Sequence, residues 1–432
     1  MSYKTDRRKF LQTTAAVGVG YWVAGGVQAQ ESKSPNERIQ FACIGIGGKG
    51  SSDSGDAAAN GDVVAICDVD RNRLKGAENR FKGAQGFTDY REMLDKLGDK
   101  IDAVTVSTPD HTHAVATAKA LKMGKHCFVQ KPLTHTIHEA RVLGELAREK
   151  GVATQMGNQG TAMPALRKAA ASIRAGAVGD VKEVHVWTNR PVWPQGGSRP
   201  PEAPVPEFLD WEAWIGPAQM RPYGNGYHPF SWRGFWDFGT GALGDMACHT
   251  MNMAFMALDL RNPVSVEAET SGHNQESFPK WSLIKYEFAA NDNRGPLTLY
   301  WYDGGKRPDK ELLEGRNAPG SGSLVIGTEG KLYSPNDYGA DYELLGGAKQ
   351  PEVEFEQSPG HFQEWVRAIK GGPAAVSNFP DYASPLTETV LLGNLAVYAG
   401  KKVEWDSKNM KATNAPELEA LVRKQYREGY TL

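Results

Sequence analysis

Two residues of this chain, Asp245 and His249, have types and spacing suited to proton transfer at a hydroxyl group, and a third, Lys131, precedes a proline that fixes the direction of its side chain. Lys131 stands between an apolar run and a proline in the stretch CFVQKPLTHT, and Asp245 and His249 are four residues apart in GALGDMACHT. Side chains at that spacing project from one face of a helix. A carboxylate beside an imidazole can fix the tautomer of the ring and raise its pKa, which would suit the ring to accept a proton near neutral pH.

Other interpretations of these residues stay open on the sequence alone. Asp245 could cap its helix while His249 fills the core, and Lys131 could be a solvated lysine at the end of a strand. A pair of metal ligands is a further possibility. No cluster of additional ligands accompanies the pair in the sequence, so we expect no metal site.

A glycine-rich segment indicates a nucleotide site. The run RIQFACIGIGGKGSSD leads from an apolar strand into G-x-G-x-x-G, and glycine there lets backbone amides approach a pyrophosphate at a helix N-terminus. The next apolar run ends in Asp68, where a carboxylate would bind the adenosine ribose and disfavour a 2′-phosphate. NAD is therefore expected, although Arg71 and Arg73 keep NADP possible. A glycine turn and a capping aspartate in an unrelated α/β protein are the alternative. The expected contacts of this segment are Gly45, Gly47, Gly48, Gly50 and Asp68.

Strands and helices alternate through residues 36–157, which predicts a doubly wound parallel sheet and a Rossmann domain. A T-x-x-E capping box from Thr136 to Glu139 and a closing Gly151 mark one of its helices. In such sheets ligands bind beyond the carboxyl ends of the strands. Further cofactor contacts are therefore expected from Ser107, Thr108, Pro109, His113, Gln130 and Lys131.

The pattern changes in residues 158–432, for which we predict an α+β domain with a mostly antiparallel open sheet. In SLIKYEF, for example, Ile284, Tyr286 and Phe288 alternate with polar residues. Residues 191–226 are rich in Pro, Gly and Trp and are typical of a long loop over a pocket. Surface or core roles are equally open for the residues that we select as candidate substrate contacts, which are Arg167, Arg190, His228, Trp232 and Arg233.

The first 29 residues resemble a twin-arginine export signal, with Arg7 and Arg8 before a short apolar, glycine-rich stretch. An amphipathic first helix is the alternative, and the glycines disfavour it. The same stretch is too short for a membrane anchor. We therefore expect a periplasmic or otherwise exported protein.

The amino-acid composition limits the classes of binding partner to be expected. Formal net charge is −2, from 49 basic and 51 acidic residues without blocks of one sign, which disfavours nucleic acid and polybasic membrane binding. The four cysteines are scattered singly, as buried apolar residues are. A small-molecule partner is expected.

Taken together, the motifs GIGGKG, STPDHTHAVATAKALKMGKH, QKPLTHT, GALGDMACH and ASPLTETVLLGNLAVYAGKKVEWD resemble the Gfo/Idh/MocA family (glucose-fructose oxidoreductase, inositol dehydrogenase) over nearly all of the chain after the signal. The resemblance implies a nicotinamide-dependent sugar or polyol dehydrogenase that forms homo-oligomers through its C-terminal sheet. It also implies that His249 is the base, that Lys131 stabilises the developing oxyanion and that Asp245 tunes the histidine.

One departure from the family pattern is Gln130, which replaces the glutamate of E-K-P. An amide removes a charge that would favour the ammonium form of Lys131.

Because free dinucleotide is not expected outside the cytoplasm, we also expect NAD to be tightly bound and recycled. The runner-up function is a redox-assisted glycosidase with sugar-stacking surfaces at Trp193, Trp211 and Trp214. The third candidate function is that of a non-catalytic binding protein that retains the fold. The sugar itself is not specified by the sequence.

Overall fold

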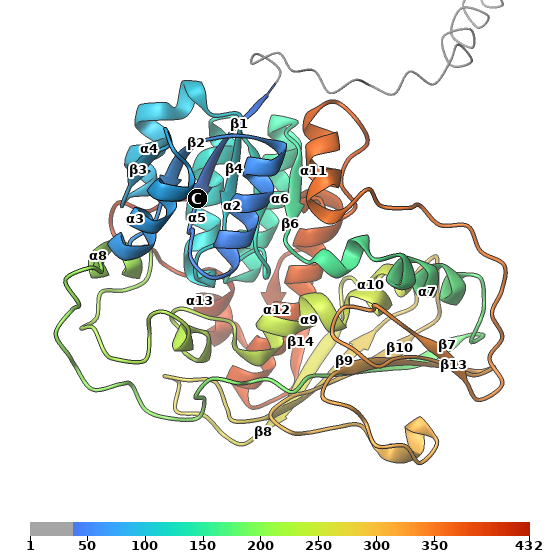
Figure 1. Cartoon of the computed structure of the whole chain (residues 1–432). Coiled ribbons are helices and arrows are strands. Elements are labelled where there is room, and N and C mark those ends of the chain that lie inside the picture. The colour runs from blue at the N-terminus through green and yellow to red at the C-terminus, as the bar shows by residue number, and fades with distance from the viewer. Residues whose placement is uncertain (1–37) are drawn as a thin grey trace, which may run out of the picture. The chain divides into compact units, whose positions relative to one another are not determined.

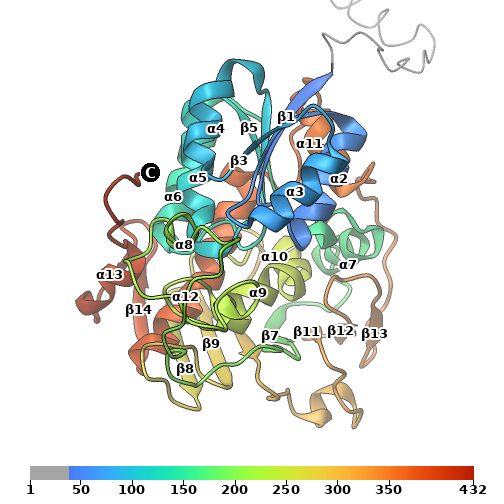
Figure 2. The same ribbon diagram turned by 60° about the vertical axis from the view of Figure 1, so that its left-hand side comes forward.

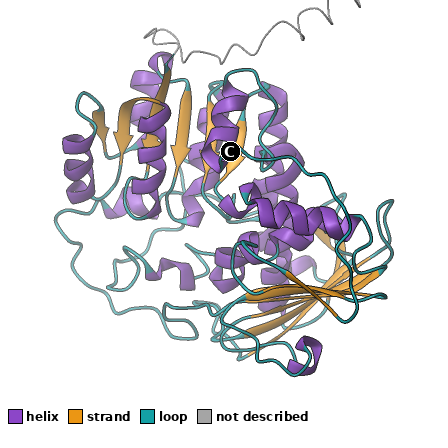
Figure 3. Cartoon of the chain, turned by 45° about the vertical axis from the view of Figure 1, so that its right-hand side comes forward, coloured by secondary structure: helices purple, strands orange, loops and turns teal. Residues whose placement is uncertain are grey.

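The computed structural model describes residues 38–432, and the predicted signal segment 1–29 lies outside them. The first sheet has six parallel strands in the order β3-β2-β1-β4-β5-β6, and helices lie on both of its faces (Figures 1 and 3). This confirms the predicted doubly wound sheet. The strands are β1 (Ile39–Ile44), β2 (Gly61–Cys67), β3 (Gln85–Phe87), β4 (Ala103–Val106), β5 (His126–Val129) and β6 (Thr154–Met156). The helices are α2 (Lys49–Asn60), α3 (Arg71–Arg80), α4 (Tyr90–Leu97), α5 (Asp110–Lys122) and α6 (Ile137–Lys150).

Local signals in the sequence explain where these helices begin and end. Thr136 accepts a hydrogen bond from the backbone N–H of Glu139, whose carboxylate in turn accepts from the backbone N–H of Thr136. Gly151 closes α6 in the left-handed conformation with φ of 62°. The predicted capping box and C-terminal glycine are therefore both present.

The second sheet has nine strands in the order β13-β12-β11-β7-β10-β9-β8-β14-β15, all antiparallel except the pair β7 and β10. This confirms the predicted mostly antiparallel sheet. The strands are β7 (Val181–Trp187), β8 (Ser265–Thr270), β9 (Ser282–Phe288), β10 (Leu297–Tyr302), β11 (Gly322–Gly327), β12 (Lys331–Ser334), β13 (Glu343–Leu345), β14 (Val403–Asp406) and β15 (Lys411–Ala412).

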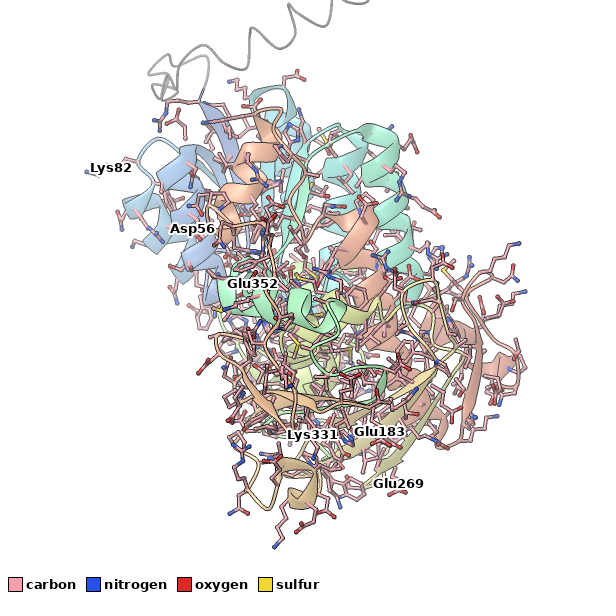
Figure 4. The ribbon with its side chains drawn as sticks, turned by 90° about the vertical axis from the view of Figure 1, so that its right-hand side faces the viewer. Asp56, Lys82, Glu183, Glu269, Lys331 and Glu352 are labelled. Carbon is pink, nitrogen blue, oxygen red and sulfur yellow. The ribbon has the colours of Figure 1, made fainter. Side chains whose placement is uncertain are left out.

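The two faces of this sheet differ in chemistry. Ile284 and Tyr286 lie in the buried face, against which helices pack. Glu183 and Lys331 flank Ile326 in the register of the opposite face and lie close together in Figure 4. Homo-oligomer formation through this sheet stays a prediction.

The helices that follow β6 are α7 (Pro164–Arg174), α8 (Trp211–Ile215), α9 (Gly241–Thr250), α10 (Asn252–Leu258), α11 (His361–Ile369), α12 (Ser384–Ala399) and α13 (Glu419–Val422).

The C-terminal part of the chain returns to the first sheet. Phe362 and Trp365 of α11 pack on Phe41 of β1, with ring centroids 6.2 and 5.8 Å apart, and Figure 2 shows α11 (orange) beside β1. Helix α12 packs along α6 and also contacts β8 and β9. Both sheets are thus joined through one continuous set of buried residues.

The loop between β7 and α9 folds around its own aromatic cluster, with Trp211 stacked on Trp214 at 4.7 Å. It also binds the first sheet's domain, because the backbone N–H of Arg71 donates to Phe208 O at 2.8 Å. These contacts hold the loop against the carboxyl end of β2. The structure thus places it over a cavity, as the sequence predicted.

Candidate active site

A cavity of about 460 Å³ extends from the carboxyl ends of the parallel strands to α9. The glycine loop after β1 lines one part of it, and Lys131, Asp245 and His249 line another. The predicted site residues that line it are Gly45, Gly47, Gly48, Asp68, Ser107, Thr108, Pro109, Gln130, Lys131, Arg190, His228, Trp232, Arg233, Asp245 and His249. Segments far apart in sequence therefore converge on one space.

The glycine loop lets neighbouring backbone segments, and a ligand, lie close to its own backbone. Gly45 has φ of 76°, and a Cβ atom added to it would lie 2.5 Å from the carbonyl oxygen of Ser107. A Cβ atom on Gly50 would lie 1.9 Å from the carbonyl oxygen of Gly45. Gly50 does not line the cavity, but its close packing lets α2 begin directly behind the loop. Such a cradle fits the pyrophosphate of a dinucleotide.

Asp68 lies just after β2 and is 7% exposed. Its carboxylate oxygens accept from the backbone N–H groups of Ile46 and Asp70, both at 3.0 Å, so the side chain is fixed beside the glycine loop. Burial raises its pKa, and those two hydrogen bonds oppose the rise. An acceptor held there suits the hydroxyl groups of an adenosine ribose. The side chain of Arg73 lies against Gly47 at the same end of the cavity.

Lys131 and Asp245 form an ion pair that joins the two halves of the site. The ammonium Nζ lies 2.8 Å from Oδ1 of Asp245 and 2.6 Å from its backbone carbonyl oxygen. Nε of Arg233 and Nε of Arg190 lie 3.3 and 3.7 Å from the same carboxylate. Burial would raise the pKa of Asp245, but Lys131 and then Arg233 outweigh it and lower that pKa to about 2. Asp245 is therefore charged at neutral pH.

His249 does not have the partner that the sequence suggested. It lies on the same face of α9 as Asp245, yet within residues 38–432 no hydrogen bond joins the two side chains, and the buried Nδ1 atom is unpaired. Burial first, and then the charge of Lys131, lower the pKa of His249 well below its usual value. Asp245 does raise this pKa, as the sequence suggested, but desolvation and the nearby cation outweigh the carboxylate. The imidazole is neutral and can accept a proton.

The side chain of Gln130 contacts a residue that the sequence analysis did not select. Its side-chain amide donates to Oδ2 of Asp53 on α2 at 2.8 Å. Asp53, which is 1% exposed, also accepts from Nζ of Lys49 at 2.6 Å and from Oγ of Ser107 at 2.7 Å. Gly157 leaves room for the amide, since a Cβ atom there would lie 2.5 Å from Nε2 of Gln130. The carboxylate that would repel a glutamate at position 130 is thus Asp53.

Besides Gly50, three predicted residues lie outside the cavity. His113 is buried and joins two of its walls, with Nδ1 2.8 Å from Pro132 O and Nε2 2.9 Å from Thr108 O. Arg167 is buried and ion-paired with Glu364, so it supports the fold and its predicted substrate contact was wrong. Trp211 belongs to the aromatic core of the loop, whereas Trp193 and Trp214 do line the cavity.

Tyr338 was missed by the sequence analysis. Its ring meets that of His249 edge to face with centroids 4.8 Å apart, and it lines the cavity. It lies in a loop after β12 with no motif around it, so only the fold reveals it.

Among residues 38–432 there is no group of three side chains that could hold a metal ion. No helix in this part of the chain is long and apolar enough to cross a membrane.

The fold and this cavity are those of a nucleotide-binding α/β protein. Residues 39–158 match the model of the oxidoreductase family's NAD-binding Rossmann fold, and residues 180–432 match that of its C-terminal alpha/beta domain. The chain belongs to this family, Gfo/Idh/MocA, which confirms the resemblance and the predicted NAD-binding domain.

Individual relatives match shorter segments. The scyllo-inositol 2-dehydrogenase (NAD(+)) of Bacillus subtilis is 31% identical over 147 residues, which are 34% of this chain and 40% of that protein. A glycosyl hydrolase family 109 protein of Solibacter usitatus is 29% identical over 153 residues, 32% of this chain and 35% of that protein. Among solved structures, the WlbA dehydrogenase from Bordetella pertussis in complex with NADH and UDP-GlcNAcA superposes with a TM-score of 0.62 at 16% identity. That match covers 85% of this chain and 99% of the other, and it shows a shared fold.

Proposed function

We propose that the protein is an NAD-dependent oxidoreductase that oxidises a hydroxyl group of a sugar, polyol or glycoside. The observation that carries the proposal is that the glycine cradle, the Lys131 ammonium and the neutral His249 imidazole all face one cavity. The scyllo-inositol dehydrogenase match supports a polyhydroxylated substrate. The carboxylate of Asp68 beside the glycine loop supports NAD over NADP, because it would repel a 2′-phosphate.

Each catalytic side chain has a role that follows from its charge. His249, neutral because its pKa is lowered by burial and by Lys131, accepts the proton of the substrate hydroxyl. Lys131 donates a hydrogen bond to the same oxygen and stabilises the negative charge that develops there. Asp245 stays ionised and fixes Lys131 through the 2.8 Å contact. When bound, NAD supplies the acceptor for the hydride that leaves the substrate carbon.

We further propose that the protein is exported through the twin-arginine pathway with NAD tightly bound. The support is the Arg7-Arg8 segment, together with the expectation that free dinucleotide is scarce outside the cytoplasm. Bound NAD would then be recycled within each turnover, either by oxidising one sugar and reducing another or by re-reducing the same sugar. Mass spectrometry of the protein purified from the periplasm tests this, because protein without bound dinucleotide would contradict it.

Redox-assisted glycoside hydrolysis is a second candidate, supported by the similarity to a glycosyl hydrolase family 109 protein. Trp193 and Trp214 line the cavity and offer stacking surfaces for a sugar ring. One experiment separates the two candidates: the purified protein is incubated with matched free sugars and glycosides. Net oxidation yields a ketone or lactone and reduced dinucleotide, whereas hydrolysis releases aglycone with no net change in the dinucleotide.

A further inference from the structure

The end of the cavity near α9 carries more positive than negative charge. Lys131, Arg190 and Arg233 surround the single carboxylate of Asp245, at nitrogen to oxygen distances of 2.8, 3.7 and 3.3 Å. Asp110 also lines the cavity, and its Oδ2 accepts from Oγ1 of Thr240 at 2.6 Å. Burial raises the pKa of Asp110. Even with both carboxylates ionised, three cations face two anions, which leaves one positive charge in excess.

The two guanidinium groups are oriented towards the same point. Both turn Nε to Asp245, so both lie within 3.7 Å of its oxygens and close to each other. Nη1 of Arg190 donates to Asn189, and Nη1 of Arg233 donates to Phe230 O at 3.2 Å. Nη2 of either arginine donates no hydrogen bond to any residue within 38–432. A pair of unused donors therefore remains on each group.

Aromatic rings hold Arg233 in place. Its guanidinium carbon lies 4.3 Å from the ring centroid of Trp232, 4.8 Å from that of Phe230 and 5.8 Å from that of Trp193. All three rings line the cavity. A planar cation fixed in this way loses little freedom on binding a planar anion. The same rings offer an apolar face to a sugar ring.

We propose that the substrate is a sugar acid, with a carboxylate that binds Nη2 of Arg190 and Arg233 while a ring hydroxyl lies at Lys131 and His249. This deepens the proposed function and rests on it. A carboxylate matches the planar guanidinium groups, and it neutralises the excess positive charge. A neutral sugar would leave both sets of Nη2 donors without an anionic partner.

The test measures binding and chemistry separately on the full NAD-loaded protein. Calorimetry compares glucuronate with glucose and galacturonate with galactose, and glucose 6-phosphate serves as the other source of an anion. We expect each acid to bind about 10- to 100-fold more tightly than its neutral partner, the range of one or two charge-assisted hydrogen bonds. Rising salt should weaken the binding of the acids and leave that of the neutral sugars unchanged.

Variants then assign the preference to the two arginines. Arg190→Gln and Arg233→Gln should each reduce it about tenfold or more, while Arg233→Lys keeps the charge and part of the preference. Arg199→Gln is the matched control, because Arg199 lies in the same loop, pairs with Glu276 at 3.0 Å and does not line the cavity. The salt dependence is measured on the wild-type protein, so it still tests the proposal if a variant fails to fold.

The outcomes separate this inference from the proposed function. Equal or weaker binding of the acids, or a preference that survives both Arg→Gln changes, overturns the inference even if neutral sugars reduce the bound NAD. Tighter binding of the phosphate than of either acid also overturns it in favour of a sugar phosphate. Arginine-dependent binding of the acids without any reduction of bound NAD supports the inference and contradicts the proposed function.

Discussion

Replacing Gln130 by glutamate should destabilise the protein through Asp53. The present contact is a donor to acceptor distance of 2.8 Å, and the substitution would put two carboxylates at that place in a buried site. Like charges about 4 Å apart repel by about 4 kcal/mol at an effective dielectric constant of about 20. Some of this repulsion is relieved when the side chains move apart, while the loss of the charge-assisted hydrogen bond adds to the cost. We expect Gln130→Glu to lower the free energy of unfolding by about 2–4 kcal/mol.

Urea unfolding at neutral pH measures this loss. Gln130→Met is the control, since it removes the donor without adding charge and should cost less. The cost of the glutamate should shrink as the pH falls, because a protonated carboxyl group can again donate to its neighbour. In the double variant that also carries Asp53→Asn, the new amide would donate to the introduced glutamate, and most of the stability should return. A Gln130→Glu protein as stable as wild type, or a second substitution whose cost simply adds to the first, would refute the reasoning.

The remaining predictions concern the catalytic pair and the buried arginine. Lys131→Met should slow hydride transfer about 10²- to 10³-fold in single-turnover measurements, while the protein stays folded because Asp245 keeps its two arginine partners. Because the pKa of His249 is lowered, the wild-type rate should stay constant as the pH falls from about 8 to about 6, and a drop centred near about 6.5 would contradict the neutral base. The same lowered pKa means that His249 costs the folded state stability as the pH falls below about 6.5. Urea unfolding measured against pH should therefore show a smaller loss of stability for His249→Gln than for wild type, while His111, His135 and His361, whose pKa values are also lowered by burial, keep their contributions. Arg167→Met should cost about 3–5 kcal/mol by leaving Glu364 buried without its partner, with an unchanged KM for substrate; a raised KM in a stable variant would restore Arg167 to the site.

The fold could be predicted because its signals are local. Short continuous apolar runs give the strands of the first sheet, and alternating apolar residues give strands of the second, such as β9. Caps such as Thr136 and Gly151 mark the helix ends. The glycine loop could also be placed, since a strand, a glycine motif and a helix in sequence leave few other arrangements.

The electrostatics of the site could not be predicted, because two of its central contacts join distant segments. Gln130 and Asp53 are 77 residues apart, and Lys131 and Asp245 are 114 apart. The spacing of Asp245 and His249 correctly predicted a shared helix face but not which side chain the carboxylate would bind. Arg167 carries the same charge as Arg233, yet its partner Glu364 lies 197 residues further along the chain.

The central claim is that Lys131 and His249 serve hydride transfer from a sugar hydroxyl in the cavity. Its most direct test uses the NAD-loaded protein and a panel of sugars and sugar acids deuterated at the ring carbons, with mass spectrometry of the dinucleotide after a single turnover. The account predicts deuterium in the dinucleotide for wild type and a large loss of transfer in both Lys131→Met and His249→Gln. Transfer that continues undiminished in these two variants, or no transfer from any member of the panel, would contradict it.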